Sequence, residues 1–331
     1  MKLSDKGELF ILDDIRRRFA CCSDNLIVGI GDDAAAFACP EKGSILASSD
    51  MMVEGVHFDL TYFTPFQVGY KLVASNVSDI YAMGGSPDWM LLILSLPESV
   101  DLSLYEYFFS GLMAASRRYN LTLIGGDITE SKRDITAGLT ILGREGGKIL
   151  RRSGASPGDK VYITGPVGEA ALGHEILRRV ARPVALEKGE RLDLELQWDE
   201  IVTYLRRFLL PEVRDMMEYS EKISAMIDIS DGLFIDLFRL CSESKVGVRI
   251  IEERLPKRAG MKEVAGFFKL DLRALMVSGG EDYQLLFTSG EEFPGFCEIG
   301  EVIDEGMYFI GNDGEEQEIK PEGYQHFVTG R

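Results

Sequence analysis

The chain has little cysteine or histidine and no long apolar run. Its 331 residues include five cysteines and three histidines. No two cysteines form a C-x-x-C pair and none stands close to a histidine, so a zinc site or disulfide framework is not expected. We interpret the cysteines as buried thiols. The longest apolar run, Trp89 to Leu96, is far shorter than the ~18 residues of a membrane-spanning helix.

Basic residues are outnumbered by acidic ones. The chain has 54 Asp and Glu against 36 Lys and Arg, a formal net charge of −18. Such a surface repels phosphate backbones and anionic lipid, so neither nucleic acid nor a membrane is expected as a partner. An anionic small molecule would need cations to mediate its binding. Residues 1–18 do not have the pattern of a signal peptide, which favours a cytoplasmic protein.

Strand-like and helix-like segments alternate along the chain, and its length predicts two domains. We expect an α/β domain over residues 1–148 and an α+β domain over 149–331, because residues 143–158 are rich in Gly, Arg, Ser and Pro. Residues 181–198 are charged without periodicity and predict an exposed insertion. Strands are expected at 26–30, 44–49, 121–124, 135–142, 160–164, 223–229, 246–251, 283–288 and 307–310.

Helix starts are marked by local sequence signals. Thr64-Pro65-Phe66-Gln67 has the spacing of a capping box with proline at the first helical position, and Gly84-Gly85 ends that helix. Ser103 predicts a second start of the same kind, for a helix to about Tyr119. Further helices are expected at 168–180 and 232–244.

Seven aspartates are the main candidates for functional residues in the sequence. Each ends an apolar strand or lies on a polar helix face, and most stand beside glycine or a hydroxyl: Asp32, Asp33, Asp50, Asp79, Asp127, Asp228 and Asp231. Alone, each is typical of a turn or cap, and Asp231 could cap the helix that begins at Gly232.

Together these aspartates predict a cation site. Like charges gathered at the edge of a sheet are costly unless cations neutralise them. Oxygen ligands without His or Cys suit magnesium, which bridges carboxylates to phosphates. Asn76 shares a helix face with Asp79, and the Ser48 and Ser49 hydroxyls stand next to Asp50.

Two other nucleotide sites are disfavoured. Residues 29–34 fit the G-x-G-x-x-A fingerprint of dinucleotide-binding proteins. However, Asp32 and Asp33 inside that turn would repel a pyrophosphate, and the segment that follows has the pattern of a strand. The chain also lacks G-x-x-x-x-G-K-[ST], so a P-loop is not expected.

The motifs, taken in order, resemble those of the thiamine-monophosphate kinase family. They are GIGDDAA, SSDMMVEGVHF, NVSDIYAMGGSPDW, LIGGD, RSGASPGD, IDISDGL and SGGEDYQLLF. The resemblance implies the two-domain fold of aminoimidazole ribonucleotide synthetase, whose N-terminal domain pairs with a second copy to form a dimeric β-barrel. It also implies an ATP site in a cleft between the N-terminal domain and the rest of the chain, near the dimer interface.

The resemblance further implies a reaction and a set of site residues. ATP would phosphorylate thiamine monophosphate to thiamine diphosphate by direct in-line transfer, with several Mg²⁺ ions neutralising the two anionic reactants. Asp50, Asp127 and Asp228 would serve catalysis through these ions. The implied metal ligands are Asp33, Ser49, Asp50, Asp79, Asp127, Asp228 and Asp231, to which we add Ser48; the ATP contacts are Gly126, Asp127, Arg152 and Ser230; the thiamine-phosphate contacts are His57, Glu281 and Tyr324.

Alternatives remain for the roles of single residues and for the function of the whole chain. His57 could be a core histidine, Arg152 a solvated linker charge, and Tyr324 C-terminal packing, while Glu281 and Asp282 could be exposed turn acids. The chain could also be another ATP-using synthetase of the same superfamily, or a non-catalytic module that binds Mg-ATP as a sensor. The sensor would keep the metal aspartates and lose the contacts to the acceptor.

Overall fold

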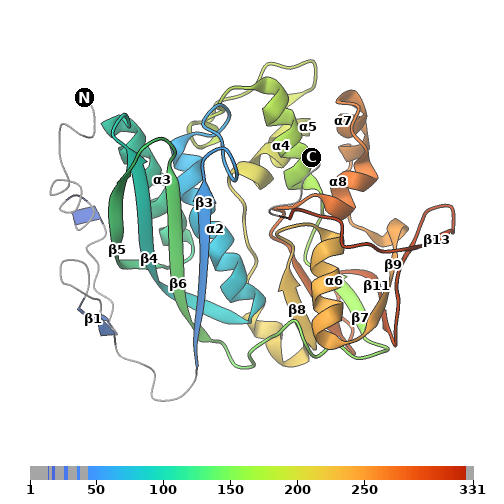
Figure 1. Cartoon of the computed structure of the whole chain (residues 1–331). Coiled ribbons are helices and arrows are strands. Elements are labelled where there is room, and N and C mark those ends of the chain that lie inside the picture. The colour runs from blue at the N-terminus through green and yellow to red at the C-terminus, as the bar shows by residue number, and fades with distance from the viewer. Residues whose placement is uncertain (1–13, 15–16, 19–25, 29–35, 38–43, 326–331) are drawn as a thin grey trace. The chain divides into compact units, whose positions relative to one another are not determined.

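The computed structural model describes residues 14, 17–18, 26–28, 36–37 and 44–325. The chain divides into two compact units, coloured by residue number in Figure 1. Unit 1 comprises Met1–Ile80, Gly85–Glu145 and Ala181–Ala185, and unit 2 comprises Tyr81–Gly84, Gly146–Val180 and Leu186–Arg331. No helix in the described ranges is long and apolar enough to cross a membrane.

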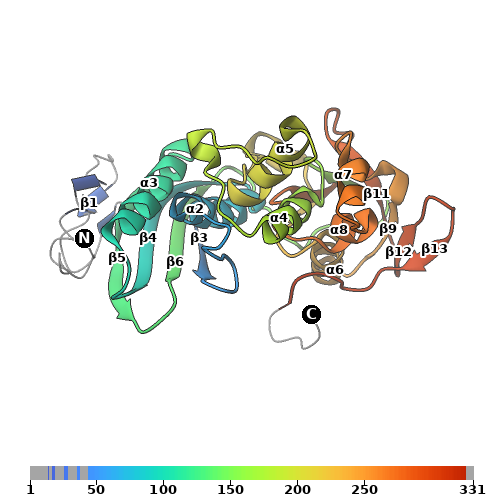
Figure 2. The ribbon, with the colours of Figure 1, turned by 90° about the horizontal axis from the view of Figure 1, so that it is seen from above.

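Unit 1 is built on a four-stranded sheet with two helices on one of its faces (Figures 1 and 2). The strands, in spatial order, are β3 (Ile45–Val53), β6 (Thr136–Glu145), β4 (Gly85–Pro97) and β5 (Thr122–Ser131). β4 is parallel to β5, and the other pairs are antiparallel. The helices are α2 (Pro65–Ala82) and α3 (Leu102–Arg118), and β1 (Leu26–Val28) pairs separately with β2 (Ala36–Phe37).

The predicted capping box of α2 is confirmed. The Thr64 amide donates to Gln67 Oε1 at 2.9 Å, and the Gln67 amide donates to Thr64 Oγ1 at 3.3 Å. The helix predicted from Ser103 to about Tyr119 is confirmed as α3, but Ser103 is not its cap, because the N-cap is Asp101, whose side chain makes no cap bond.

The strands of unit 1 run further than their apolar residues indicate. β3 continues to Val53 and β5 to Ser131, so Asp50 and Asp127 lie inside strands rather than after them. The expectation that Asp127 ends an apolar strand is therefore wrong. β4 was not predicted as a strand, although it contains the longest apolar run and lies between β6 and β5. Partner strands, rather than local sequence, set these lengths.

Two glycines bring α2 and α3 into backbone contact. A Cβ built on Gly111 would lie 1.8 Å from the carbonyl oxygen of Phe66, and one on Gly69 would lie 2.2 Å from that of Phe108. Real Cβ atoms do not approach oxygens so closely, so both positions require glycine. The two helices are held at this spacing by residues that have no side chain.

Unit 2 contains a seven-stranded sheet in the order β13-β12-β9-β11-β7-β10-β8. All pairs are antiparallel except β12 with β9. Its strands are β7 (Lys160–Ile163), β8 (Ala225–Asp228), β9 (Gly247–Ile251), β10 (Leu285–Ser289), β11 (Cys297–Ile303), β12 (Met307–Ile310) and β13 (Glu316–Glu318). Each strand predicted in this unit is confirmed within a few residues, while β11 and β13 were not predicted.

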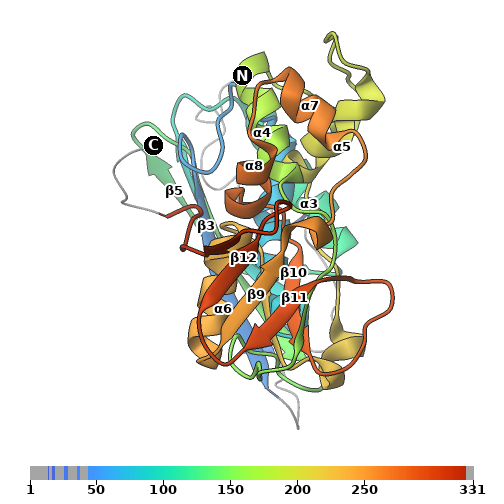
Figure 3. The same cartoon turned by 90° about the vertical axis from the view of Figure 1, so that its right-hand side faces the viewer.

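Helices α4 (Glu169–Val180), α5 (Trp198–Leu209), α7 (Met261–Phe267) and α8 (Leu272–Ser278) gather at one end of this sheet, and α6 (Leu233–Ser244) lies along it (Figures 1 and 3). Short 3₁₀ turns occupy Leu186–Lys188, Met217–Lys222 and Glu252–Arg254. The helices predicted at 168–180 and 232–244 are confirmed as α4 and α6, and α5, α7 and α8 were missed.

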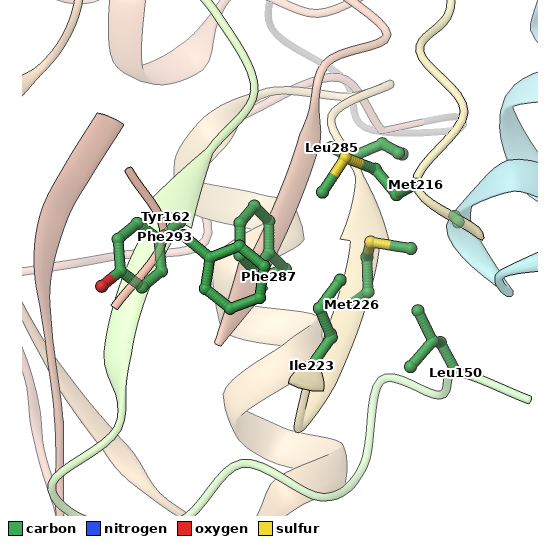
Figure 4. Close-up of a cluster of buried hydrophobic side chains, with 9 residues drawn as sticks. Leu150, Tyr162, Met216, Ile223, Met226, Leu285, Phe287 and Phe293 are labelled. Carbon is green, nitrogen blue, oxygen red and sulfur yellow. The ribbon is translucent and has the colours of Figure 1, made fainter. Parts of the chain in front are cut away.

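Aromatic rings form the centre of unit 2 (Figure 4). Tyr162 stacks on Phe287 at 5.2 Å between ring centroids, and Phe293 meets Phe287 edge-on at 5.0 Å. Such offset and edge-to-face pairs are favourable beyond the area that they bury. Cys241 is a buried thiol, as expected, and this burial raises the pKa of its thiol to about 12. Cys297 is half-buried, and Cys21, Cys22 and Cys39 lie outside the described residues.

The insertion predicted at 181–198 is not simply exposed. Val184, Leu186 and Leu192 are buried. The side-chain amide of buried Gln67 donates to the carbonyl oxygen of Val184 at 2.6 Å. Residues 181–185 consequently belong to unit 1, although they follow α4 of unit 2 in the sequence.

We expect Gly111→Ala to destabilise the protein by about 1–3 kcal/mol, as overpacked interiors do, because the new methyl group would push α3 away from Phe66. The matched control is Gly266→Ala, a helical glycine whose Cβ would meet nothing within 4 Å. Alanine there should be neutral or stabilise by up to about 1 kcal/mol. Urea unfolding of both variants measures the difference, and equal midpoints would contradict the packing role of Gly111.

Candidate functional site

Four predicted polar residues meet where β3 crosses α2 in unit 1. The Ser48 hydroxyl donates to Asp79 Oδ2, and the backbone amide of Asp50 donates to Asn76 Oδ1 at 2.9 Å. Asn76 is fully buried, and its side-chain amide donates to the carbonyl oxygen of Leu72 at 2.8 Å. We call Ser48, Asp50, Asn76 and Asp79 the β3–α2 cluster.

The β3–α2 cluster presents oxygen atoms in a fixed arrangement. Asn76 is anchored to its own helix by Leu72 and therefore holds the backbone of β3 at Asp50. The cluster contains no nitrogen or sulfur ligand, and carboxylate and hydroxyl oxygens are the donors that magnesium prefers. Its donor set therefore fits a hard divalent cation.

Asp127 and Ser49 lie on the other face of the same sheet. The strand register aligns Asp50 with Leu139, Leu92 and Gly126, and it aligns Asp127 with Ile93. Leu92 and Leu139 are buried, whereas Ile93 is exposed. β3 and β5 are also separated by β6 and β4, three strand spacings of about 4.8 Å each. A single chain thus does not bring Asp127 to the β3–α2 cluster, and its role stays a prediction.

Gly126 is a position where only glycine fits. Its φ is +151°, and a Cβ there would lie 1.8 Å from the carbonyl oxygen of Leu92. The backbone of β5 therefore approaches β4 closely just before Asp127.

His57 closes a tight turn after β3. Its Nδ1 accepts from the Val53 amide at 3.0 Å, while its own amide donates to the Val53 carbonyl at 2.9 Å. The bond to Nδ1 requires that this nitrogen carry no proton. The half-buried ring is thereby oriented by the turn rather than by an apolar core.

Asp33 lies outside the described residues, as does Asp32. Within the described part of the chain, no three His, Cys, Asp or Glu side chains are grouped closely enough to hold a metal ion by themselves.

In unit 2 the predicted residues converge on the segment Asp228–Gly232, which we call the aspartate loop. Asp228 is buried at the end of β8. The carbonyl of Ser230 accepts from the Glu281 amide at 2.7 Å, and that of Asp231 accepts from the Tyr324 amide at 2.8 Å. Three distant parts of the sequence are thus joined by backbone hydrogen bonds.

The sequence suggested that Asp231 could cap the helix that follows this loop, but it does not. Asp236, in the first turn of α6, accepts from the amides of Ser230, Asp231 and Gly232 at 3.1, 3.0 and 3.2 Å. Asp236 therefore satisfies donors that the helix start leaves unpaired, and its near-complete burial raises the pKa of its carboxyl to about 6. Arg239 donates to Asp236 and also to Asp231.

Arg152 does not join the aspartate loop through its backbone. Its carbonyl accepts from the hydroxyl of Ser244, which is the last residue of α6. α6 has 12 residues and is about 18 Å long, so Ser244 and Ser230 lie at opposite ends of the helix. The exposed Arg152 side chain as an ATP contact stays a prediction.

Asp282 is not an exposed turn acid. It is completely buried, and its carboxylate accepts from the Gly168 amide at 2.5 Å and the Ala170 amide at 2.9 Å at the start of α4. Burial raises the pKa of this carboxyl to about 7. The neighbouring Glu281 is held at φ +67° by its bond to Ser230.

Asp236, Arg239 and Asp282 were missed as supporting residues. An acid four residues into a helix is usually interpreted as part of its polar face. Asp282 comes two residues after Gly280, where the sequence suggests an exposed turn. Asp236 stands four residues after Gly232, the one usable sign that it could fold back onto the start of its own helix.

Both halves of the sequence match domain models of one family. Residues 31–144 match the N-terminal domain of AIR synthase related proteins, and residues 156–311 match their C-terminal domain.

Individual relatives match over most of the chain. A thiamine-monophosphate kinase from Salmonella typhimurium is 37% identical over 91% of this chain and 92% of its own length. One from Aquifex aeolicus is 33% identical over 99% of this chain and its own full length. A solved structure described as AaThiL complexed with AMPPCP and TMP is 31% identical, covers 99% of both chains and has a TM-score of 0.75.

Asp282 predicts a pH dependence of stability. Because its pKa is raised in the folded state, the folded protein binds an additional proton between about pH 4 and pH 7, and this stabilisation is lost as pH rises through 7. The melting temperature of Asp282→Asn relative to the parent protein should therefore increase from pH 5 to pH 8.5. Asp271→Asn, at the exposed cap of α8, controls for removing a capping carboxylate. A difference that falls with rising pH would contradict the prediction.

Proposed function

The chain belongs to the family of thiamine-monophosphate kinases, within the AIR synthase related proteins, and from this we infer that it transfers the γ-phosphate of ATP to thiamine monophosphate. The products are thiamine diphosphate and ADP. The observation that carries this function is identity of 33–37% with named kinases across nearly the whole chain. The expected two-domain fold with mixed α/β content is confirmed by the two domain matches.

We propose, on the family resemblance, that the β3–α2 cluster of unit 1 and the aspartate loop of unit 2 each bind Mg²⁺ with phosphate oxygens of ATP. When bound, magnesium would neutralise the phosphate oxygens between which the phosphoryl group moves. Asn76 keeps Asp50 in position through the backbone, and Ser48 orients Asp79. Gly126 is kept as a proposed ATP contact on the family resemblance, since the space that a side chain would fill there is taken by the Leu92 carbonyl. Asp127, Arg152 and Ser230 are kept as proposed ATP contacts on the family resemblance.

The acceptor contacts are proposed on the same basis, with support from unit 2. Glu281 and Tyr324 are both tied by backbone bonds to the loop that carries Asp228 and Asp231. A carboxylate at Glu281 suits the amino group of the aminopyrimidine, and the Tyr324 ring suits stacking on a cationic thiazolium. His57, oriented by its own turn, would complete the set.

We also propose that the active protein is a homodimer whose unit 1 sheets close into a β-barrel. The sheet face opposite α2 and α3 exposes Met51 at 57% and Ile93 at 56%. Strand register aligns both residues with Gly138 in the same row. Apolar side chains at the middle of an uncovered sheet favour burial against a partner. A cytoplasmic location remains a prediction of the sequence.

The proposed reaction is tested by incubating the protein with Mg-ATP and thiamine monophosphate and separating the products by chromatography. Thiamine diphosphate should form one-for-one with ADP. ADP without thiamine diphosphate would indicate another acceptor, and bound ATP without ADP would indicate a sensor.

Asp50→Asn should lower turnover by orders of magnitude with an unchanged circular dichroism spectrum, because it removes a proposed ligand charge from the exposed part of β3. Near-normal turnover of this variant would contradict the metal role.

The dimer is tested by Ile93→Glu. A carboxylate at the centre of the exposed row should convert dimers to monomers, as measured by light scattering after size-exclusion chromatography. Phe267→Glu is the control, because it also replaces an exposed apolar residue, at 45% exposure, but lies on α7 of unit 2. A parent protein that is monomeric, or a variant that stays dimeric, would overturn the proposal.

A further inference from the structure

One nitrogen atom of Arg239 joins two carboxylates beside the aspartate loop. Its Nη1 lies 2.6 Å from Asp236 Oδ1 and 2.7 Å from Asp231 Oδ2. Each terminal nitrogen of a guanidinium carries two N–H groups, so one atom can serve both acceptors. Charge-assisted bonds of this length are strong and directional.

The inner end of this bridge is immobile. Asp236 is only 1% exposed, and its second oxygen accepts three consecutive backbone amides. It lies one helical turn before Arg239 on α6. Exposed ion pairs contribute little because both side chains must be ordered to make them. Here the partner of Arg239 is already fixed by the fold.

The outer end of the bridge is Asp231, whose backbone is fixed on both sides. Its amide donates to Asp236, and its carbonyl accepts from Tyr324. Gly232 follows with φ +133° and packs against the backbone of Ser278. Only the side-chain torsions of Asp231 are not fixed by these backbone bonds, and the ion pair with Arg239 fixes them.

We propose that Arg239, anchored by Asp236, is a positioning residue that holds the Asp231 carboxylate in the orientation required to bind a divalent cation. The inference rests on the proposed function for the identity of the nucleotide. The binding of the cation can be measured without the reaction. Residues that hydrogen-bond to metal-ligating carboxylates typically change metal affinity by about 10–100-fold when they are mutated.

If Arg239 and Asp236 affected cation binding only through their charges, their variants would behave differently. Removing the cation of Arg239 reduces repulsion and would tighten binding of a divalent ion, whereas neutralising Asp236 would weaken it. Positioning requires both groups, so either loss should weaken binding. The sign of the effect in the arginine variant therefore separates the two explanations.

The experiment compares Arg239→Met, Asp236→Asn and the double variant, in which the local net charge equals that of the parent. Binding of Mn²⁺ is followed by electron paramagnetic resonance on the full-length protein with a non-hydrolysable ATP analogue. We expect the Kd for Mn²⁺ to rise about tenfold or more in each single variant, and the double variant to be no weaker than the weaker single. Tighter or unchanged binding in Arg239→Met, or single effects that cancel in the double variant, would overturn the proposal.

Two further variants exclude a trivial structural effect. Arg239 is 34% exposed, so Arg239→Met should fold even if Asp236→Asn does not, and Arg239→Lys, which keeps the charge and a donor, should recover part of the affinity. Arg178→Met breaks an equivalent pair with Glu175, at 2.8 Å and the same helical spacing, and should leave Mn²⁺ binding unchanged.

Kinetics supply a second measurement. In Arg239→Met the Mg²⁺ concentration at half-maximal rate should rise by the same factor as the Kd, while kcat at saturating Mg²⁺ changes less than about threefold. A fall in kcat with an unchanged Mg²⁺ requirement would contradict positioning. If the parent protein forms no thiamine diphosphate, the proposed reaction fails, but the Mn²⁺ comparison still decides the role of Arg239.

Discussion

Buried polar side chains that accept backbone amides hold the candidate site in shape. Asn76 accepts the amide of Asp50, Asp236 accepts three amides of the aspartate loop, and Asp282 accepts two at the start of α4. A buried acceptor or donor left unpaired costs about 1–3 kcal/mol, so these bonds exclude alternative loop conformations. The backbone positions of the exposed candidate residues thus depend on side chains that are themselves buried.

This arrangement suits a chain with a net charge of −18. The supporting carboxylates of Asp236 and Asp282 are buried and accept hydrogen bonds from the backbone, whereas Asp50 and Asp127, which we propose as cation ligands, are exposed. The supporting Asp236 and Asp282 have raised pKa values because burial disfavours their charged forms. Asp228 is a proposed ligand that is also buried, so burial alone does not separate the supporting acids from the proposed ligands.

Local signals in the sequence predicted local structure well. The Thr64–Gln67 capping box, the strands of unit 2 and the order of the motifs all depend on residues close together in the chain. The lengths of the strands in unit 1 could not be predicted from local sequence, because pairing with partner strands extends β3 and β5 past their apolar residues. The assignment of residues 181–185 to unit 1 depends on a bond from Gln67 more than a hundred residues away, which no local pattern reveals.

The order of strands in unit 2 also bears on how the chain folds during its synthesis. β7 is made near residue 160, yet its partners in the described sheet are β10 and β11, at residues 285–303. The sheet of unit 1 is complete by residue 145. Long-range pairing is slow, and unpaired strands are prone to aggregate. When β7 has been synthesised, the strands of the first sheet are all present, but β7 itself lacks both partner strands until more than a hundred further residues have been added.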